Sequence, residues 1–368
     1  MAFRRSPVSQ TCAVVLILHS FLLFLLLTLY YGMKLPAYNP YSAKQGTVPN
    51  SSSSLKVNSR TLPQQKSSNL APQIILLWTW PSGHAFPLND CPASIDSSGC
   101  FFTVNRSLYS MANAVVFHHR DVSGSKSLLP QVPRPPHQYW VWFSLESPSN
   151  IRNLSMMDNI MNLTMSYRLD SDIFMPYGRL GKLDEEQNFT IPKKVGLVAW
   201  IISNWNLEHR RYAYYLELKQ HIQIDIYGKH HLPLPRHLQF LNLVTYKFYL
   251  AFENSIHEDY ITEKLWANSF FIGTVPVVMG PPRENYERFI PPDSFIHVDD
   301  FSSAKELAHY LLNLAKDDQK YQQYFNWRSR FQLLRVRNIF EAAYCKVCKA
   351  LKEAPGYRTI PSIAKWFT

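Results

Sequence analysis

Residues 252–265 read FENSIHEDYITEKL. Phe252 is the last residue of an apolar run that predicts a buried β-strand. Polar residues come next, and Asp259 is expected to begin a helix. A strand that passes through a loop into a helix offers free N–H groups to an anion. Lys264 could neutralise a diphosphate there, and Glu263 could accept hydrogen bonds from ribose hydroxyls. The same acids could instead cap an ordinary helix.

The chain around this stretch alternates between strand-like and helical patterns. Short apolar and aromatic runs predict strands at 74–80, 114–118, 139–145, 194–203, 222–227, 247–252, 275–279 and 294–298. Apolar residues at helical spacing predict helices at 208–220, 259–272 and 303–316. This alternation predicts parallel sheets covered on both faces, in two α/β lobes joined near residues 180–193. Ligands of such proteins bind at the carboxyl ends of strands, in the crevice between lobes.

Two more predicted strand ends carry candidate functional groups. Ser203 and Asn204 could bond a nucleotide, and Arg211 in the following helix could bind a phosphate. Arg211 could equally be a solvated surface cation. Glu146 follows the aromatic strand at 139–145, where a carboxylate suits general-base catalysis, although a loop hydrogen bond is the commoner role of such a residue.

The N-terminus predicts a membrane anchor. Residues 12–32 are long and apolar enough to cross a bilayer as one helix. Arg4 and Arg5 precede them, so the positive-inside rule predicts a cytosolic tail at 1–11 and a lumenal remainder. A cleaved signal peptide is the alternative, but its apolar region would be shorter.

The rest of the chain is expected to form a stem and two lobes. Residues 33–72 are rich in Ser, Pro, Asn and Gln and predict a disordered stem. The 368 residues are 46% hydrophobic, enough for a folded core, which we divide into an N-terminal lobe at 73–190 and a C-terminal lobe at 191–368. The formal net charge of +11 suits a polyanionic partner, but a lumenal location disfavours nucleic acid.

Glycosylation signals and cysteines agree with a secretory route. The Asn-x-Ser/Thr acceptors are Asn50, Asn105, Asn153, Asn162 and Asn188. Outside the anchor, four cysteines form two clusters, Cys91/Cys100 and Cys345/Cys348. They could bind zinc, but an oxidising lumen favours two disulfides that tie the C-terminus to the N-terminal lobe. The sequence leaves the pairing order open.

Several stretches of the chain resemble one known family. Residues 252–301 resemble the signature region of the α1,3-fucosyltransferases that build Lewis-type glycans, and the resemblance extends from about residue 74. Matching motifs occur in the same order at 118–121, 144–148, 167–172 and 203–206. Within the family, the chain is most similar to the brain-type branch. The resemblance implies a GT-B fold of two Rossmann-like lobes with a cleft between them. It also implies inverting transfer from GDP-fucose, with no tightly bound cofactor and no metal required for the chemistry.

The resemblance implies roles for single residues. Glu146 matches the general base that takes the proton from the 3-hydroxyl of GlcNAc, and Arg211 and Lys264 match the cations that hold the departing diphosphate. The other implied donor contacts are Tyr177, Ile201, Ser203, Asn204, Tyr249, Asn254, Tyr260 and Glu263. Beside Glu146, the loop with His84 and the ring of Trp327 would face the acceptor sugar.

Two short motifs refine this prediction. Asp170-Ser171-Asp172 is a D-x-D motif, which binds Mn²⁺ in another glycosyltransferase fold, but we interpret it here as an acidic turn. Arg120 stands where family members able to form α1,4 linkages carry Trp, which favours α1,3 transfer to Gal-β1,4-GlcNAc.

The leading hypothesis is a Golgi enzyme that forms Lewis x. We expect a single-pass type II membrane protein that acts on N-acetyllactosamine of glycoproteins and glycolipids, and a homodimer is compatible with it. The alternatives are a core or peptide-directed α1,3-fucosyltransferase and an inactive, membrane-tethered glycan-binding relative.

Overall fold

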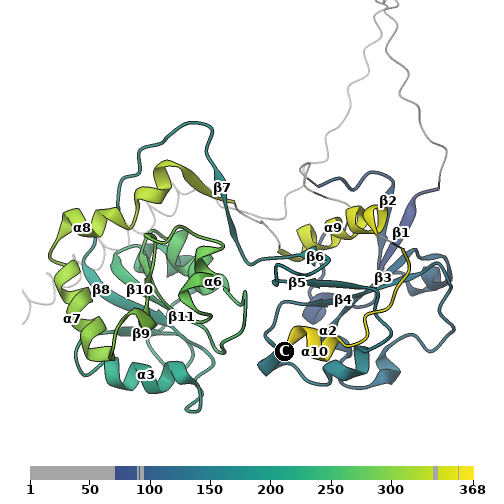
Figure 1. Cartoon of the computed structure of the whole chain (residues 1–368), viewed down its shortest axis with the longest axis horizontal. Coiled ribbons are helices and arrows are strands. Elements are labelled where there is room, and N and C mark those ends of the chain that lie inside the picture. Colours follow the sequence, from purple (N-terminus) through teal and green to yellow (C-terminus); the bar gives the residue numbers. More distant parts are fainter. Residues whose placement is uncertain (1–70, 89–90, 92–94, 335–338, 355) are drawn as a thin grey trace, which may run out of the picture. The chain divides into compact units, whose positions relative to one another are not determined.

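The computed structural model describes residues 71–88, 91, 95–334, 339–354 and 356–368. Ser68–Thr368 form one compact unit that contains two parallel sheets (Figure 1). The predicted tail, the predicted anchor at 12–32 and nearly all of the predicted stem lie outside the described residues. Within the described ranges, no helix has both the length and the apolar character needed to span a bilayer.

The first sheet has six parallel strands in the order β2-β1-β3-β4-β5-β6. They are β1 (Gln73–Leu77), β2 (Cys100–Thr103), β3 (Ala114–His118), β4 (Tyr139–Ser144), β5 (Leu163–Ser166) and β6 (Ile173–Phe174). Helix α9 (Ile339–Glu353) lies on one side of this sheet, and α2 (His119–Val122) and α10 (Ile363–Phe367) lie on the other (Figure 1).

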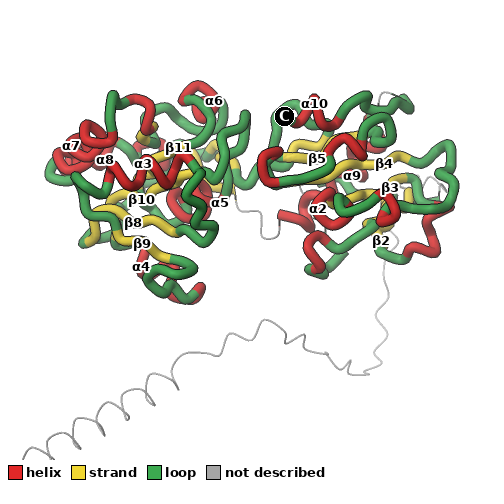
Figure 2. The backbone as a smooth tube through the Cα atoms, turned by 90° about the horizontal axis from the view of Figure 1, so that it is seen from below, coloured by secondary structure: helices red, strands yellow, loops and turns green. Residues whose placement is uncertain are grey.

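The second sheet has five parallel strands in the order β12-β11-β10-β8-β9. They are β8 (Gly196–Ile201), β9 (Asp225–Tyr227), β10 (Tyr246–Phe252), β11 (Val275–Met279) and β12 (Ile296–His297). Its helices are α3 (Arg210–Leu218), α4 (Gln239–Leu243), α5 (Glu263–Leu265), α6 (Arg283–Glu287), α7 (Ala304–Leu314) and α8 (Asp318–Gln323). Figure 2 shows the strands of both sheets with helices around them.

Alternate residues of β10 enter two separate cores, which confirms that this sheet is covered on both faces. Phe248 and Leu250 pack with Leu307 of α7 in one core. Tyr249 and Ala251 belong to the other core, which includes the apolar residues of α5. Side chains alternate between the faces of a strand, so a central strand covered on both sides reads as one apolar run.

The C-terminal helices pack on the first sheet. Ala343, Tyr344 and Val347 of α9 and Phe367 of α10 lie in the core that β1, β3 and β4 build. The division at residue 190 therefore assigned to the second lobe a segment that packs on the first. A small antiparallel sheet of β7 (Arg179–Lys182) and β13 (Phe331–Leu334) pairs the chain just before the second sheet with the chain just after it.

The helix expected from Asp259 begins four residues later. Asp259 has a φ of 61°, in the left-handed region, and α5 starts at Glu263. The Asp259 carboxylate accepts hydrogen bonds from the Leu169 N–H at 2.8 Å and the Asn285 amide at 2.8 Å. These long-range contacts fix a turn where local sequence favours a helix, and α5 continues as a π-helix at Trp266–Phe270.

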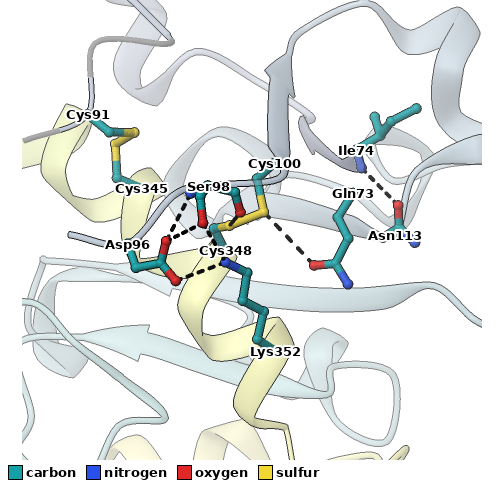
Figure 3. The surroundings of a disulfide bond; sticks show 10 residues. All are labelled: Gln73, Ile74, Cys91, Asp96, Ser98, Cys100, Asn113, Cys345, Cys348 and Lys352. Atoms are coloured by element: carbon teal, nitrogen blue, oxygen red, sulfur yellow. Dashed lines mark hydrogen bonds and ion pairs between the residues drawn. A yellow bond between two sulfur atoms is a disulfide. The ribbon is translucent and has the colours of Figure 1, made fainter. Parts of the chain in front are cut away.

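Two disulfides form, as predicted, and the structure gives their pairing (Figure 3). Cys91 bonds to Cys345 and Cys100 bonds to Cys348, with Cα separations of 5.7 and 6.0 Å. Both join α9 to the region of β1 and β2. Lys352 of α9 adds an ion pair to Asp96 at 3.0 Å.

We expect loss of one disulfide to cost much less than loss of both. With Cys100–Cys348 intact, the other bridge closes a ring of only 91–100 plus 345–348, which is 10 + 4 = 14 residues. A loop of that size contributes about 3 kcal/mol in the chain-entropy model, and the long loop contributes about 5 kcal/mol. Denaturant unfolding of C91A/C345A, and of the variant lacking all four cysteines, measures both steps. Equal free energies of unfolding for the two variants would contradict this account.

Candidate active site

The strand order of the second sheet reverses at the carboxyl ends of β8 and β10. These strands are neighbours, but the chain continues from them toward opposite edges of the sheet. A reversal of this kind leaves room for a ligand at the strand ends. Ser203 and Asn204 lie exposed just beyond β8, whereas Glu253 and Asn254 follow β10.

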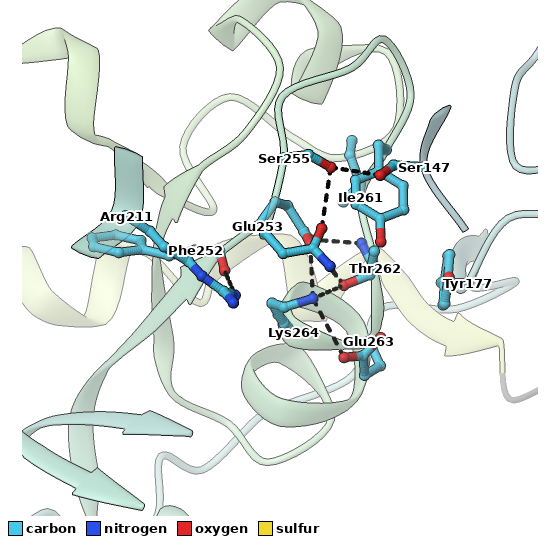
Figure 4. Close-up of polar contacts among 12 residues, drawn as sticks. Ser147, Tyr177, Arg211, Phe252, Glu253, Ser255, Ile261, Thr262, Glu263 and Lys264 are labelled. Carbon is cyan, nitrogen blue, oxygen red and sulfur yellow. Dashed lines mark hydrogen bonds and ion pairs between the residues drawn. The ribbon is translucent and has the colours of Figure 1, made fainter. Parts of the chain in front are cut away.

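Glu253 is the first residue after β10, and it is buried (Figure 4). Its carboxylate accepts hydrogen bonds from the Thr262 N–H at 2.8 Å and the Thr262 hydroxyl at 2.9 and 3.0 Å. Lys264 Nζ donates to it at 2.8 Å. Burial raises the pKa of the Glu253 carboxyl, while the charge of Lys264 acts against that rise. These bonds tie the start of the loop to the start of α5.

Lys264 is a charged ammonium with three oxygen partners. Nζ lies 2.8 Å from Glu253 Oε2, 2.7 Å from Thr262 Oγ1 and 3.5 Å from Glu263 Oε1. Burial alone would lower the pKa of Lys264, but Glu253 and Glu263 raise it above its usual value. The Glu263 side chain is half exposed and makes the longest contact. It is therefore the partner that an incoming phosphate oxygen can replace most easily.

Arg211 joins the ends of the two central strands from α3. Its guanidinium donates to the Asn204 carbonyl at 2.6 Å and to the Phe252 carbonyl at 3.4 Å. The Nε atom is buried and has no hydrogen-bond partner in the described part of the chain. Burial lowers the pKa of Arg211, and the charge of Glu253 opposes that effect. In Figure 4 the guanidinium points toward Lys264, so two cations face one site.

Glu146 brings a carboxylate of the first sheet to this site. It follows β4, and its Oε1 accepts hydrogen bonds from the Tyr260 hydroxyl at 2.7 Å, the Ser147 N–H at 3.0 Å and the Asn150 amide at 3.3 Å. Tyr260 lies in the loop that leads into α5, the helix of Lys264. Among the described residues, no hydrogen bond engages Glu146 Oε2. One carboxylate oxygen is thus fixed, and the other can accept a proton.

Two more hydrogen bonds join the loop after β4 to the loop after β10. The Ser255 hydroxyl donates to Ser147 at 2.6 Å, and Ser149 and His257 share a bond of 2.7 Å. The loop that carries Glu146 is therefore bonded directly to the loop that leads to Lys264.

The family follows from comparison with known proteins. Residues 70–178 match the profile described as "Fucosyltransferase, N-terminal", and residues 191–366 match "Glycosyltransferase family 10 (fucosyltransferase) C-term". The chain belongs to the family 10 fucosyltransferases. The predicted family and the prediction of a glycosyltransferase are confirmed.

Curated relatives are about half identical to this fucosyltransferase. The 3-galactosyl-N-acetylglucosaminide 4-alpha-L-fucosyltransferase FUT3 of Bos taurus is 52% identical over 82% of this chain and 83% of its own length. The 4-galactosyl-N-acetylglucosaminide 3-alpha-L-fucosyltransferase FUT5 of Homo sapiens is 49% identical over 80% of each chain. Their names give different linkages, so family membership leaves the linkage of this fucosyltransferase undecided.

A solved structure shares the fold. The crystal structure of an alpha1,3-fucosyltransferase with GDP-fucose aligns with a TM-score of 0.51 at 16% identity, over 81% of this chain and 96% of that chain. At this identity the likeness supports the predicted α/β glycosyltransferase architecture and nothing finer.

Several predicted donor-contact residues of this fucosyltransferase lie at the site. Tyr177 donates to the Leu145 carbonyl, beside Glu146, and burial raises its pKa well above the usual value. Ile201 is half-buried at the end of β8. The Asn254 side chain accepts a hydrogen bond from Ser255 at 3.1 Å.

Two predicted contacts are corrected by burial. Tyr249 is 0% exposed, and its hydroxyl accepts a hydrogen bond from Asn268 at 3.2 Å. Trp327 is 1% exposed, with its ring centroid 4.6 Å from that of Phe270. Neither residue presents a surface to a sugar or a nucleotide, so the prediction of an acceptor contact for Trp327 is wrong in this structure. Both are core residues of the second sheet.

The loop that contains His84 is exposed, and hydrogen bonds to Asp121 hold it in place. The Asp121 carboxylate accepts hydrogen bonds from the Ser82 N–H at 3.0 Å and the Thr79 hydroxyl at 3.4 Å, and it pairs with His118 at 2.7 Å. His84 itself is exposed, which leaves its proposed acceptor contact open to test.

The two acids of the D-x-D motif both have protein donors. Asp170 pairs with Arg168 at 2.8 Å, and the Trp366 indole donates to it at 3.0 Å. Asp172 accepts bonds from the N–H and the hydroxyl of Thr164, both at 2.8 Å. The motif forms a turn that is tied to β5 and α10.

One predicted glycosylation site is blocked. Asn162 is 1% exposed, and its amide nitrogen, the atom that would carry a glycan, donates to the Arg358 carbonyl at 2.6 Å. Asn105, Asn153 and Asn188 are exposed, whereas Asn50 lies outside the described residues. The sequon at Asn162 is a structural asparagine of the fold.

Sequence reasoning missed Glu253 and Thr262 as site residues. Glu253 directly follows an apolar strand, which is the same signal that singled out Glu146. Thr262 has no such signal, because its role depends on a carboxylate nine residues earlier in the chain.

Proposed function

We propose that this fucosyltransferase transfers fucose from GDP-fucose to the 3-hydroxyl of GlcNAc in Gal-β1,4-GlcNAc and so forms Lewis x. The observation that carries the proposal is the bond between Glu146 and Tyr260. This bond supports a site that combines a carboxylate of the first sheet with Arg211 and Lys264 of the second.

The arrangement supports a single in-line displacement. Glu146 Oε2 accepts the proton of the acceptor hydroxyl while the acceptor oxygen bonds to the anomeric carbon of fucose. The bond from that carbon to the phosphate oxygen breaks, and GDP leaves with the electron pair. Arg211 and Lys264 offset the charge that develops on the diphosphate. Such a displacement needs the base and the cations on opposite sides of the sugar, and it inverts the anomeric configuration.

The preference for a type 2 acceptor is supported by Arg120. This residue is exposed at the start of α2, directly after His118 and His119. His119 is fixed by bonds to the Arg152 carbonyl at 2.7 Å and to the Trp142 indole at 3.0 Å. We propose that Arg120 disfavours the α1,4 linkage.

The address of the enzyme is part of the proposal. We place it in the Golgi membrane as a single-pass type II protein that acts on glycoproteins and glycolipids. Two disulfides and three exposed sequons support an oxidising lumen. Protease protection of the lobes in intact vesicles tests this topology.

The activity is tested with a panel of acceptors. The full-length chain with labelled GDP-fucose should modify Gal-β1,4-GlcNAc, and NMR of the product should show an α1,3 linkage. Gal-β1,3-GlcNAc and a core glycopeptide serve as the competing acceptors. Transfer to either of these alone, or GDP binding without transfer, would contradict the proposal.

Tyr260→Phe is expected to lower kcat about tenfold and to change the KM for GDP-fucose less than kcat, because the ring, for which a donor contact is implied, is kept. The hydroxyl donates to a charged group, and such hydrogen bonds contribute about 1.5–3 kcal/mol. Without it, Glu146 loses the contact that aims it from the second sheet. Steady-state kinetics with both substrates measure the change.

Tyr310→Phe is the matched control. Its hydroxyl bonds to Tyr324 at 2.6 Å on an exposed face of α7, away from Glu146. Equal losses in the two variants would show that removal of a hydroxyl acts through stability alone.

A further inference from the structure

We infer that Glu253 is a positioning residue of this enzyme: with Thr262, its buried carboxylate fixes the Lys264 ammonium before the donor binds. The inference rests on the proposed function, because it takes Lys264 as a ligand of the donor diphosphate.

Glu253 acts through other groups and cannot meet the substrate itself. Its side chain is 1% exposed. One carboxylate oxygen accepts the backbone N–H and the hydroxyl of Thr262, and the other accepts that hydroxyl and Lys264 Nζ. Each oxygen is therefore turned toward the loop that presents Lys264.

Thr262 also holds the Lys264 ammonium in place. It is the residue just before α5, where a threonine side chain commonly caps the helix, yet its hydroxyl makes no cap. The hydroxyl contacts Glu253 and lies 2.7 Å from Lys264 Nζ. This side chain therefore serves the ion pair in place of the helix.

A fixed ammonium favours binding of an anion. A lysine has a flexible stem with many rotamers, and ordering it on ligand binding weakens affinity. Glu253 and Thr262 order it during folding. A buried ion pair adds little net stability compared with apolar residues of the same volume. Stability alone therefore does not account for a carboxylate at this position.

The test measures GDP affinity by titration calorimetry on the full-length chain. Glu253→Gln and Thr262→Val should each weaken GDP binding, by about tenfold and about threefold to tenfold respectively. Thr262→Ser keeps the hydroxyl and should remain within about twofold of the native affinity. Native GDP affinity in folded E253Q and T262V would overturn the inference.

A double-mutant cycle separates positioning from a general structural role. In a Lys264→Met background, Glu253→Gln should change GDP affinity by less than about twofold, because the group that it positions is gone. Additive losses would overturn the inference. If K264M does not fold, the comparison of T262V with T262S decides alone.

Glu306→Gln is the matched control. Glu306 accepts hydrogen bonds from the N–H and the hydroxyl of Ser302 at the start of α7, so it makes similar contacts without Lys264. GDP affinity should not change in this variant. Fucosyl transfer is measured separately. Native GDP binding without fucosylation of any acceptor refutes the proposed function. Additive losses of GDP affinity in the double-mutant cycle refute only the role of Glu253.

Discussion

Glu146→Gln is expected to lower kcat by about 10²–10⁴-fold, because a positioned general base contributes on that order. The amide keeps an oxygen that can accept the Tyr260 hydroxyl, so the loop geometry should survive. GDP affinity should stay within about twofold of the native value, since Arg211 and Lys264 are untouched. Single-turnover transfer and GDP calorimetry on the same preparation measure the two effects.

Glu258→Gln is the control for this prediction. Glu258 is an exposed carboxylate in the loop after β10, close to Tyr260 in the sequence, and it pairs with Arg288 at 2.9 Å. Its loss should leave turnover unchanged. If Glu146→Gln retained native turnover, Glu146 could not be the base. If it also lost GDP binding, its role would be structural.

The local patterns of the chain predicted the central strands and the site at their ends. The apolar runs at 139–145 and 247–252 placed Glu146 and the loop that leads to Lys264 at strand ends. Parallel strands end at one edge of a sheet, so polar residues that follow such runs lie close together. This physics needs no long-range information, which is why Arg211, Lys264 and Glu146 could be named from sequence.

The missed features depend on contacts between distant residues. Asp259 reads as the first residue of a helix, but a backbone N–H from Leu169, 90 residues earlier, fixes it in a left-handed turn. The resemblance implies that Trp327 faces the acceptor, yet its ring is buried against Phe270. The strands β5 and β6 span only four and two residues, too short for a recognisable strand pattern. The residues that make these contacts are distant from one another in the chain, so no local sequence pattern predicts them.

One short segment carries Lys264, the proposed donor cation, and Tyr260, whose hydroxyl contacts the proposed base. Lys264 and Tyr260 are four residues apart, and Glu253 holds the segment between them through Thr262. A diphosphate that engages Lys264 would therefore act on a segment already bonded to Glu146.

Lys264→Met is expected to reduce turnover and stability together. It removes a cation from the leaving diphosphate, at a cost of about 10²–10³ in kcat. It also leaves the Glu253 carboxylate buried without its partner, which destabilises a fold by about 3–5 kcal/mol. Steady-state kinetics and denaturant unfolding measure the two losses.

Adding Glu253→Gln to Lys264→Met should separate these losses. The neutral amide removes the uncompensated charge, so most of the unfolding free energy should return, whereas turnover should not. Lys320→Met, which breaks an exposed pair with Asp317 at 3.3 Å, is the control for loss of a surface ion pair and should cost about 1 kcal/mol or less. Recovery of turnover together with stability would mean that Lys264 serves the fold and not the diphosphate. Recovery of stability without recovery of turnover would show that the charge of Lys264 acts on the departing GDP.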